Sequence, residues 1–282
     1  MSEIKRERAY PHLFSPMIIK GKRFKNRIIT APTHHSFAVD PDNNLNMFGV
    51  KVWGDRAKGG AGAVTIGEGK LDKLNSCAHS GHVNCCDEIA LQRLHFFTDY
   101  VHTYGALASI EFNHSGQFAL PEYNSQHIGP MGASAITMPN GLKVKEMDEN
   151  DMNQVADSYA YACLIAKRAG FDMVLLHFAH GWLMGGFLSP LVNHRTDEYG
   201  GSIENRCRFP LMVLKRIREA VGDEFILECR ISGDELTPGG IVIDDAIEML
   251  KIFEPYIDMA HISCGTRLNA VTRAIMHPSH FI

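Results

Sequence analysis

The feature that most constrains the fold is a series of short, largely apolar runs, each followed by a segment with a helical pattern. Six such runs are predicted as strands: NRIITAP (26–32), GAGAVTIGEG (60–69), ALASIEFNHSG (106–116), FDMVLLHFAH (171–180), DEFILECRIS (223–232) and IDMAHISCG (257–265). Their apolar residues do not alternate with polar ones, which indicates strands that are buried on both faces, as in a parallel sheet covered by helices. The sequence therefore predicts a repeated β/α fold.

The segments between these runs carry helix signals at their ends. Residues 148–170 have acidic residues in the first turn, basic residues in the last and Gly170 beyond them, an order that complements the helix dipole. Residues 87–105 form a helix pattern that stops at Gly105, a preferred residue after a helix end. Further helices are predicted at residues 46–60, 202–222 and 243–256.

A chain of repeated βα units can form an open doubly wound sheet or a closed barrel. Polar residues gather at the C-terminal ends of several predicted strands, among them Glu111, His177, Arg230 and Ser263. Barrels build their sites in this way, and no GxGxxG motif of a Rossmann fold follows the first strand. We therefore predict an α/β TIM (β/α)8 barrel with about six of the eight βα units, in one domain that spans residues 1–282. Because a barrel needs eight strands to close, we expect this domain to be incomplete at its C-terminus.

Charge and cysteine usage narrow the class of protein. The formal net charge is −4 and no basic block stands out, which argues against a nucleic-acid partner. The N-terminal segment MSEIKRERAYPHLF has no apolar core of a secretory signal. The seven cysteines are odd in number, scattered and free of a C-x-x-C motif. They indicate reduced thiols and a cytoplasmic protein.

Residues 173–192 contain no Asp, Glu, Lys or Arg and are as long as a membrane span. Two histidines, three glycines and Pro190 interrupt this run, and Asp172 and His194 flank it. We interpret it as a buried strand followed by an apolar loop, and we expect no membrane partner.

A long stretch inside the chain resembles a known family. The run 177-HFAHGWLMGGFLSPLVNHRTDEYGGSIENRCRF-209 resembles the flavin-dependent old yellow enzyme family, and most closely its branch of 2,4-dienoyl-CoA reductases, 2-enoate reductases and bile-acid desaturases. The similarity extends from about Leu13 to the end of the chain. It implies a barrel that binds FMN and transfers a hydride between NADH or NADPH and the C=C bond of an α,β-unsaturated carbonyl compound, such as an enoyl-CoA or a steroid-like acid. The expected partner is then a small-molecule substrate, and the chain could also form a homo-oligomer.

His177 and His180 match the family's histidine pair, which hydrogen-bonds the carbonyl oxygen of the substrate. Two donors on one oxygen withdraw electron density from the conjugated alkene, so its β-carbon accepts a hydride. Zinc is the competing interpretation of this HxxH pattern. Because HxxH alone is a weak metal signal and no third ligand at a fixed spacing is evident, we predict no metal.

The resemblance also implies a set of flavin contacts. Arg230 matches the arginine that stabilises the negative charge of reduced FMN, and Glu111 stands where much of the family has a glutamine facing the pyrimidine edge. A carboxylate there would repel the anionic flavin oxygen unless Arg230 compensates it or it binds a proton. The remaining predicted contacts are Ala31, Pro32 and Thr33, which match backbone beside the ring, and Gly67, which matches a small residue packed against it.

Trp182 departs from the family pattern, because the family commonly has there a tyrosine that protonates the substrate's α-carbon. An indole N–H donates hydrogen bonds but is no practical acid. Another group would have to serve, and Tyr123, Tyr199, His34, His35 and a water molecule all stay open. Alternatively, Trp182 shapes a pocket for a bulky apolar substrate.

Other expected parts of such an enzyme lie outside this sequence. In the family the FMN phosphate sits in the loops after strands seven and eight, and relatives of this branch carry an iron–sulfur cluster and a second nucleotide-binding domain further along. We therefore expect an iron–sulfur cluster and FAD only in a longer parent chain. Three alternatives to the ene-reductase stay open: an amine dehydrogenase of the same fold, a non-catalytic remnant, and a metal-dependent barrel hydrolase.

Overall fold

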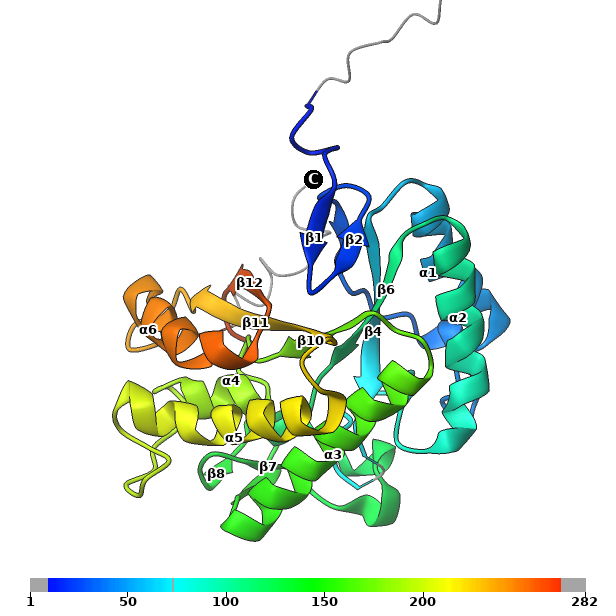
Figure 1. Ribbon diagram of the computed structural model, residues 1–282. Helices are drawn as coiled ribbons and strands as arrows, with labels where there is room; N and C mark the ends of the chain where they lie inside the picture. The colour runs from blue at the N-terminus through cyan, green and yellow to red at the C-terminus, as the bar shows by residue number, and fades with distance from the viewer. Residues whose placement is uncertain (1–9, 73, 270–282) are drawn as a thin grey trace, which may run out of the picture.

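The computed structural model describes residues 10–72 and 74–269 of the chain, and its centre is a curled parallel sheet (Figure 1). The strands follow one another across the sheet in the order β12-β11-β10-β6-β4-β3, and β5 pairs with β4 outside this path. The strands are β3 (Ile29–Thr30), β4 (Ala63–Lys70), β5 (Val83–Asn84), β6 (Leu107–Phe112), β10 (Met173–His177), β11 (Ile226–Asp234) and β12 (Met259–Cys264). Each of the six predicted runs overlaps one strand of this path, so the predicted series of parallel strands is confirmed.

The predicted helices are also present, and they cover the outer side of the sheet (Figure 1). They are α1 (Met47–Lys58), α2 (Leu91–Thr103), α3 (Glu149–Arg168), α5 (Ile203–Val221) and α6 (Ile243–Phe253). Helix α3 begins at a capping box, in which the Asp148 carboxylate accepts from the Asp151 N–H at 2.9 Å. A curled parallel sheet inside a layer of helices forms an incomplete TIM barrel, as the sequence predicts.

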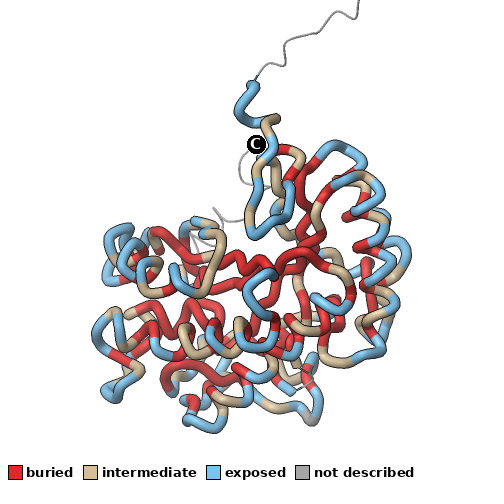
Figure 2. The backbone as a smooth tube through the Cα atoms, in the orientation of Figure 1, coloured by how far each residue is buried: buried red, intermediate tan, exposed pale blue. Residues whose placement is uncertain are grey.

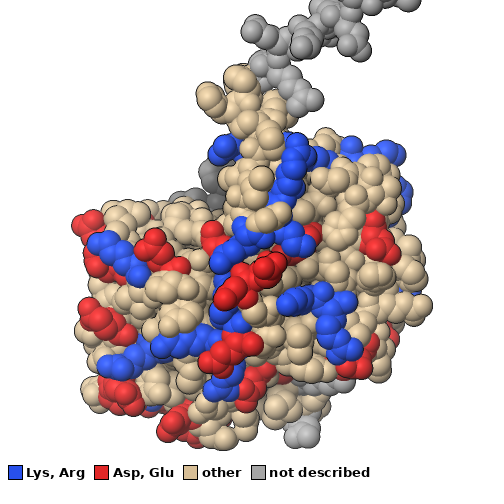
Figure 3. Space-filling model, in the orientation of Figure 1, with Lys and Arg blue, Asp and Glu red and all other residues tan. Residues whose placement is uncertain are grey.

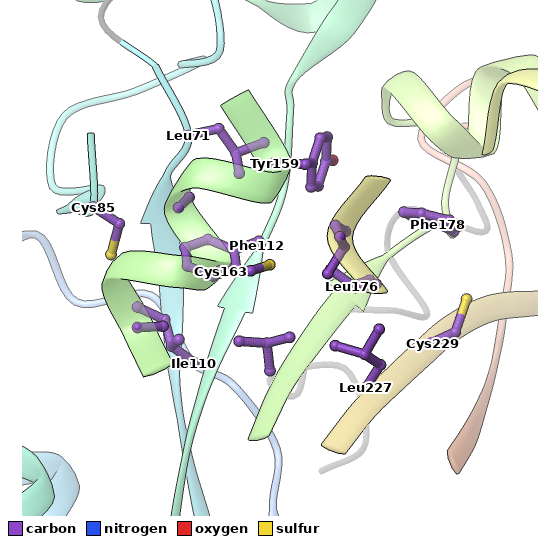
Figure 4. Packing of buried hydrophobic residues seen from close by; sticks show 14 of the residues in the cluster. Leu71, Cys85, Ile110, Phe112, Tyr159, Cys163, Leu176, Phe178, Leu227 and Cys229 are labelled. Atoms are coloured by element: carbon purple, nitrogen blue, oxygen red, sulfur yellow. The ribbon is translucent and has the colours of Figure 1, made fainter. Parts of the chain in front are cut away.

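The core lies between the sheet and these helices (Figure 2). Ile110, Leu176 and Leu227 of three neighbouring strands belong to the same buried cluster as Tyr159 and Cys163 of α3 (Figure 4). None of these five side chains is measurably exposed to solvent. Burial on both faces explains why the strands lack an alternating pattern.

The prediction for residues 173–192 is wrong in one part. The segment after β10 is not an irregular loop but contains a short helix, α4 (Leu183–Leu188), whose six residues are all buried. Its glycines allow close packing, because a Cβ atom on Gly185 would lie 2.8 Å from the carbonyl oxygen of Ala179. Among the described residues, no helix is both long enough and apolar enough to cross a bilayer.

Two small sheets were not predicted. One is a hairpin of β1 (Met17–Ile19) and β2 (Lys22–Phe24), and the other joins β7 (Met131–Gly132), β8 (Ile136–Thr137) and β9 (Lys143–Glu146). The hairpin brings the fully buried Phe24 against Ala63, Met173 and Ile226, which lie at the beginnings of β4, β10 and β11. It therefore covers the N-terminal end of the sheet and leaves the functional residues at the C-terminal end.

Ion pairs fasten this hairpin to the barrel. Lys22 Nζ lies 3.0 Å from an Asp172 oxygen, and Lys20 Nζ lies 3.4 Å from an Asp258 oxygen that belongs to the loop before β12. Figure 3 shows this face, where basic and acidic side chains are interspersed over the surface. The face presents no purely basic patch of the type that binds nucleic acid.

Candidate active site

The strand ends bring four of the predicted site residues together. His177 is the last residue of β10 and lies in register with Arg230 of β11, while Glu111 is in register with Leu175 of β10. Glu111, His177 and His180 are 8%, 4% and 6% exposed, so the groups that would carry chemistry are shielded from water.

These residues form a connected hydrogen-bonded set, which we call the histidine network: Glu111, His177, His180, Ser263 and Arg230. His177 Nδ1 lies 2.7 Å from Glu111 Oε1, and its Nε2 lies 3.0 Å from His180 Nδ1. His180 Nε2 lies 2.8 Å from the Ser263 hydroxyl, which also accepts from Arg230 Nη2 at 3.2 Å. Arg230 Nη1 lies 3.5 Å from Glu111 Oε1, so the contacts form a closed ring.

The backbone holds His180 in place. Its φ angle of 61° lies in the left-handed region that few residues other than glycine and asparagine adopt. The His180 N–H donates to the Ser232 hydroxyl at 3.0 Å, and that hydroxyl donates to the Gly265 carbonyl at 3.0 Å. The Arg267 N–H donates to the His180 carbonyl at 3.0 Å. Ser232 of β11 and the residues that follow β12 thus fix the backbone of His180.

Both histidines are neutral near pH 7. Burial, His177 and the charge of Arg230 lower the pKa of His180 to about 2, and burial with Arg230 lowers the pKa of His177 well below its usual value. Each imidazole therefore carries one N–H and one lone pair, and its neighbours decide which nitrogen has the proton.

Glu111 has the opposite behaviour. Burial and the negative charge of Glu68 raise the pKa of Glu111 to about 8, although Arg230 and His261 oppose the rise. At neutral pH the carboxyl is therefore mostly protonated, which is one of the two conditions under which a glutamate fits beside a flavin.

One proton on Glu111 sets the direction of the network. When Glu111 is protonated, its O–H donates to His177 Nδ1, so His177 Nε2–H donates to His180 Nδ1 and His180 Nε2–H donates outward to Ser263. When Glu111 is ionised, it accepts from His177 Nδ1–H, and every bond along the chain reverses. His180 Nε2 is then an acceptor. An acceptor that cannot donate can replace the Ser263 hydroxyl only in the protonated state of Glu111.

The predicted flavin-contact segment meets Glu111. A Cβ atom on Gly67 would lie 2.8 Å from Pro32 Cβ and 3.1 Å from Glu111 Oε2, so only glycine fits between them. The carbonyl of Ala31 accepts from Arg56 at 3.3 Å, and the Thr33 hydroxyl accepts from Arg56 at 2.7 Å. Helix α1 thereby holds residues 31–33 from behind.

These residues fit the ring of FMN. The Nε of Arg230 is buried and has no hydrogen-bond partner among the described residues. A buried donor requires an acceptor, and the charged edge of a flavin would supply one. The roles of Ala31, Pro32, Thr33, Gly67, Glu111 and Arg230 as flavin contacts stay predictions.

Trp182 is held by its neighbours rather than by the histidine network. The residue is 7% exposed, and the guanidinium carbon of Arg267 lies 4.3 Å from its ring centroid. Phe118 packs edge-on against the ring, with the centroids 5.6 Å apart. Of the candidate proton donors, Tyr199 lies against Arg195, whereas His35 Nε2 lies 3.1 Å from the Thr33 hydroxyl. His35 is thus in contact with the flavin-contact segment.

Sequence reasoning gave no role to two serines in this site. Ser263 was visible as a polar residue at a strand end, but its place between His180 and Arg230 depends on the pairing of β11 with β12. Ser232 pairs in register with Ser263 and supports His180 from the other side. The signal for both was the position at a strand's carboxyl end.

An incomplete barrel with polar residues at its strand ends is the arrangement that comparisons with known proteins also find. Residues 12–281 match the model of the NADH:flavin oxidoreductase / NADH oxidase family. The chain belongs to this family, the old yellow enzyme family.

Two curated relatives are similar over most of the chain. It is 30% identical over 274 residues to an NADH oxidase of Thermoanaerobacter brockii, which covers 96% of this chain and 42% of that protein. It is 32% identical over 255 residues to an NADPH dehydrogenase of Clostridium acetobutylicum, which covers 90% of this chain and 74% of that protein. The chain thus spans less than half of the first relative and about three quarters of the second.

Solved structures show the same fold. A 2-naphthoyl-CoA reductase superposes with a TM-score of 0.84 at 27% identity, covering 92% of this chain and 41% of that chain. A histamine dehydrogenase from Rhizobium sp. 4-9 superposes with a TM-score of 0.81 at 28% identity, covering 92% of this chain and 37% of that chain. Morphinone reductase, at 24% identity and a TM-score of 0.79 over 89% of this chain and 73% of that chain, supports the barrel fold alone.

Proposed function

We propose that this chain binds FMN and transfers a hydride between NADH or NADPH and the C=C bond of an α,β-unsaturated carbonyl compound, an enoyl-CoA or a steroid-like acid. The observation that carries the proposal is the neutral histidine pair, 3.0 Å apart and connected to a protonated Glu111. Neutral N–H donors suit a carbonyl oxygen, which develops negative charge during the reaction. The 2-naphthoyl-CoA reductase among the similar structures supports an acyl-CoA substrate.

The residues of the chain divide the work. When bound, FMN supplies the hydride. His180 Nε2–H donates to the substrate oxygen, and His177 orients His180 through the 3.0 Å contact of their ring nitrogens. Arg230 places a fixed positive charge beside the site, where it favours the reduced cofactor. Trp182 leaves delivery of the proton to another group, and His35, whose Nε2 lies 3.1 Å from the Thr33 hydroxyl, is one candidate beside Tyr123, Tyr199, His34 and a water molecule.

A flavin-dependent amine dehydrogenase is the second candidate function. The observation in its favour is the 28% identity to histamine dehydrogenase. An amine substrate has no carbonyl oxygen, so a donor network aimed at an oxygen argues for the ene-reductase. We assign no iron–sulfur cluster to this chain, and a cluster with FAD belongs to the proposal only for a longer parent chain. The cytoplasm stays the predicted compartment, and the oligomeric state stays open.

A spectroscopic experiment tests the proposal. The purified chain, supplied with FMN, is expected to retain a yellow colour after gel filtration and to bleach under NADH or NADPH without oxygen. Addition of an enone or an enoyl-CoA is then expected to reoxidise the flavin and restore the colour. If only artificial dyes reoxidise the NADH-reduced protein, the proposed ene-reductase activity is contradicted. Bleaching by an amine favours the second candidate. A chain that stays colourless with added FMN supports the non-catalytic remnant.

The pH dependence of enone reduction is expected to follow Glu111. Because the pKa of Glu111 is about 8, its proton and the outward N–H of His180 are lost as the pH rises through that value. The value of kcat/KM is expected to fall about tenfold between pH 7 and pH 9, as the protonated fraction of one such group falls. The groups that surround Glu111 and set this pKa are Glu68, Arg230 and His261, with His177 in direct contact.

The Glu111→Gln variant is the control. Its side-chain amide can donate an N–H to His177 Nδ1 at every pH, so the profile is expected to be flat between pH 7 and pH 9. If kcat/KM of Glu111→Gln still falls between pH 7 and pH 9 as in the wild type, a group other than Glu111 causes the fall.

A further inference from the structure

A second cluster of ligand-type side chains lies beside the histidine network, where β4 ends and the segment before β5 returns to it. Glu68, His79 and His82 each offer one ligand atom, and these atoms all lie within 4.8 Å of one another. Glu68 Oε2 lies 3.6 Å from His79 Nε2, and Glu68 Oε1 lies 3.5 Å from His82 Nδ1. The flavin and substrate roles proposed above use none of the three.

His82 is the least explained member of the cluster. Its side chain is 1% exposed, and neither ring nitrogen has a hydrogen-bond partner among the described residues. Buried polar atoms in proteins are nearly always satisfied, because leaving one unpaired costs free energy. A buried imidazole with two unpaired nitrogens beside a carboxylate therefore indicates a ligand that is bound there.

His79 points to a cation as that ligand. Its Nδ1 lies 3.0 Å from the carbonyl oxygen of Ser80, which can only accept, so Nδ1 carries the hydrogen. In the neutral ring, Nε2 is then a lone pair that faces a Glu68 oxygen at 3.6 Å. Two acceptors that face each other require a positive charge between them, either a proton on His79 or a metal ion.

The surroundings match the outer shell of a metal site. Metal-binding histidines usually donate their other N–H to a backbone carbonyl, as His79 does to Ser80, and metal-binding carboxylates are themselves hydrogen-bonded. The Asn113 amide donates to Glu68 Oε1 at 2.9 Å and fixes that carboxylate. The side chain of Glu68 is 12% exposed and that of His79 is 35% exposed, so an ion can reach the cluster from solvent.

The local sequence places the ligands. His79 and His82 form a second HxxH pattern, and Gly81 between them has a φ angle of 90°. A Cβ atom on Gly81 would lie 2.7 Å from the Ser36 backbone, so the turn needs glycine. The two rings stack with their centroids 4.4 Å apart, and the end of β4 supplies the third group.

We propose that Glu68, His79 and His82 bind a divalent transition-metal ion, with zinc as the best match. Two imidazoles and one carboxylate are a known ligand set of zinc, and hard ions such as magnesium prefer oxygen ligands alone. With bonds of about 2.1 Å, neighbouring ligand atoms of a tetrahedral site lie about 3.4 Å apart. His79 and His82 lie 3.6 and 3.5 Å from the two different oxygens of Glu68, and all ligand atoms of the cluster lie within 4.8 Å of one another, so the three side chains would draw together around the ion. The ion would tie the segment before β5 to the ends of β4 and β6.

Titration of the chain with Zn²⁺ alone tests the proposal. The FMN-supplemented chain is first stripped with a chelator, and the heat of Zn²⁺ binding and the spectrum of added Co²⁺ are then recorded. One equivalent is expected to bind, with a tetrahedral Co²⁺ band. His79→Ala and His82→Ala are each expected to weaken Zn²⁺ binding by at least about 100-fold, since even loss of an outer-shell partner costs about 10- to 100-fold.

Two control variants make the result specific. His180→Ala removes a member of the other HxxH pattern, and His12→Ala removes an exposed histidine near the N-terminus; both variants are expected to bind one equivalent of Zn²⁺. Because His82 is buried, its variant could unfold, so the partly exposed His79 provides the second test: Zn²⁺ is expected to raise the melting temperature of the wild type and not that of His79→Ala. No binding by the wild type, or binding that is lost in His180→Ala and kept in His79→Ala, overturns the proposal and leaves a proton on His79 as the bridging charge.

Discussion

Replacing His180 by alanine is expected to lower kcat for enone reduction by about 100- to 1,000-fold, the loss that follows removal of one donor to a developing oxyanion. The Nε2 atom of His180 lies 2.8 Å from the Ser263 hydroxyl, which a substrate oxygen would replace in the proposed role. Rapid mixing of the reduced protein with an enone measures this step. The rate at which NADH bleaches the protein is expected to change little, because the donor acts on the acceptor substrate.

Two further variants separate the lost donor from a backbone effect. Asparagine is tolerated at the φ angle of 61° of His180 and keeps an N–H donor, so His180→Asn is expected to lose less activity than His180→Ala. His127 has a φ angle of 52° on the surface, and His127→Ala imposes a similar backbone strain away from the site. Wild-type turnover by His180→Ala, or an equal loss in His127→Ala, would refute the assigned role.

Replacing Arg230 by methionine is expected to lower the reduction potential of bound FMN by on the order of 80 mV. Two unit charges about 4 Å apart interact by about 4 kcal/mol at an effective dielectric constant of about 20, and about 1.4 kcal/mol corresponds to about 30 mV for a two-electron couple. The side chain of Arg230 is only 20% exposed, so water screens its charge little. Equilibration with a reference dye during slow reduction measures the potential.

Arg230→Lys keeps the positive charge but loses the paired contact of the guanidinium with Glu111 and Ser263. Its reduction potential is therefore expected to lie closer to that of the wild type than to that of Arg230→Met. Arg208→Met removes an arginine whose side chain is 51% exposed and is expected to leave the potential unchanged. If the potential of Arg230→Met equals that of the wild type, Arg230 does not lie beside the flavin. Slower bleaching by NADH is expected to accompany the lower potential.

The sequence predicts the sheet well because its strands are buried on both faces and leave a strong apolar signal. Helix α3 is equally clear, since both of its ends carry charges that suit the helix dipole. Helix α4 was missed because six apolar residues with two glycines have no polar face that would reveal a helical period. Strands β7 and β8 have two residues each, too few for any pattern.

The candidate site was also predictable in part from the sequence. The long family match and the strand-end rule selected His177, His180, Glu111 and Arg230, and the structure brings these four together. The protonation of Glu111 depends on burial and on the charge of Glu68, and neither is visible in a linear pattern. The cluster around His82 was missed for a related reason, because its carboxylate lies on a strand that precedes both histidines.

The clamped loop of His180 has a thermodynamic consequence. Ser232, Gly265 and Arg267 fix this residue through hydrogen bonds that involve no ligand. The loop is therefore ordered when the chain folds, and binding of a small molecule does not include an entropy cost for ordering it. Backbone amides around His180 should therefore exchange slowly with deuterium even in ligand-free protein.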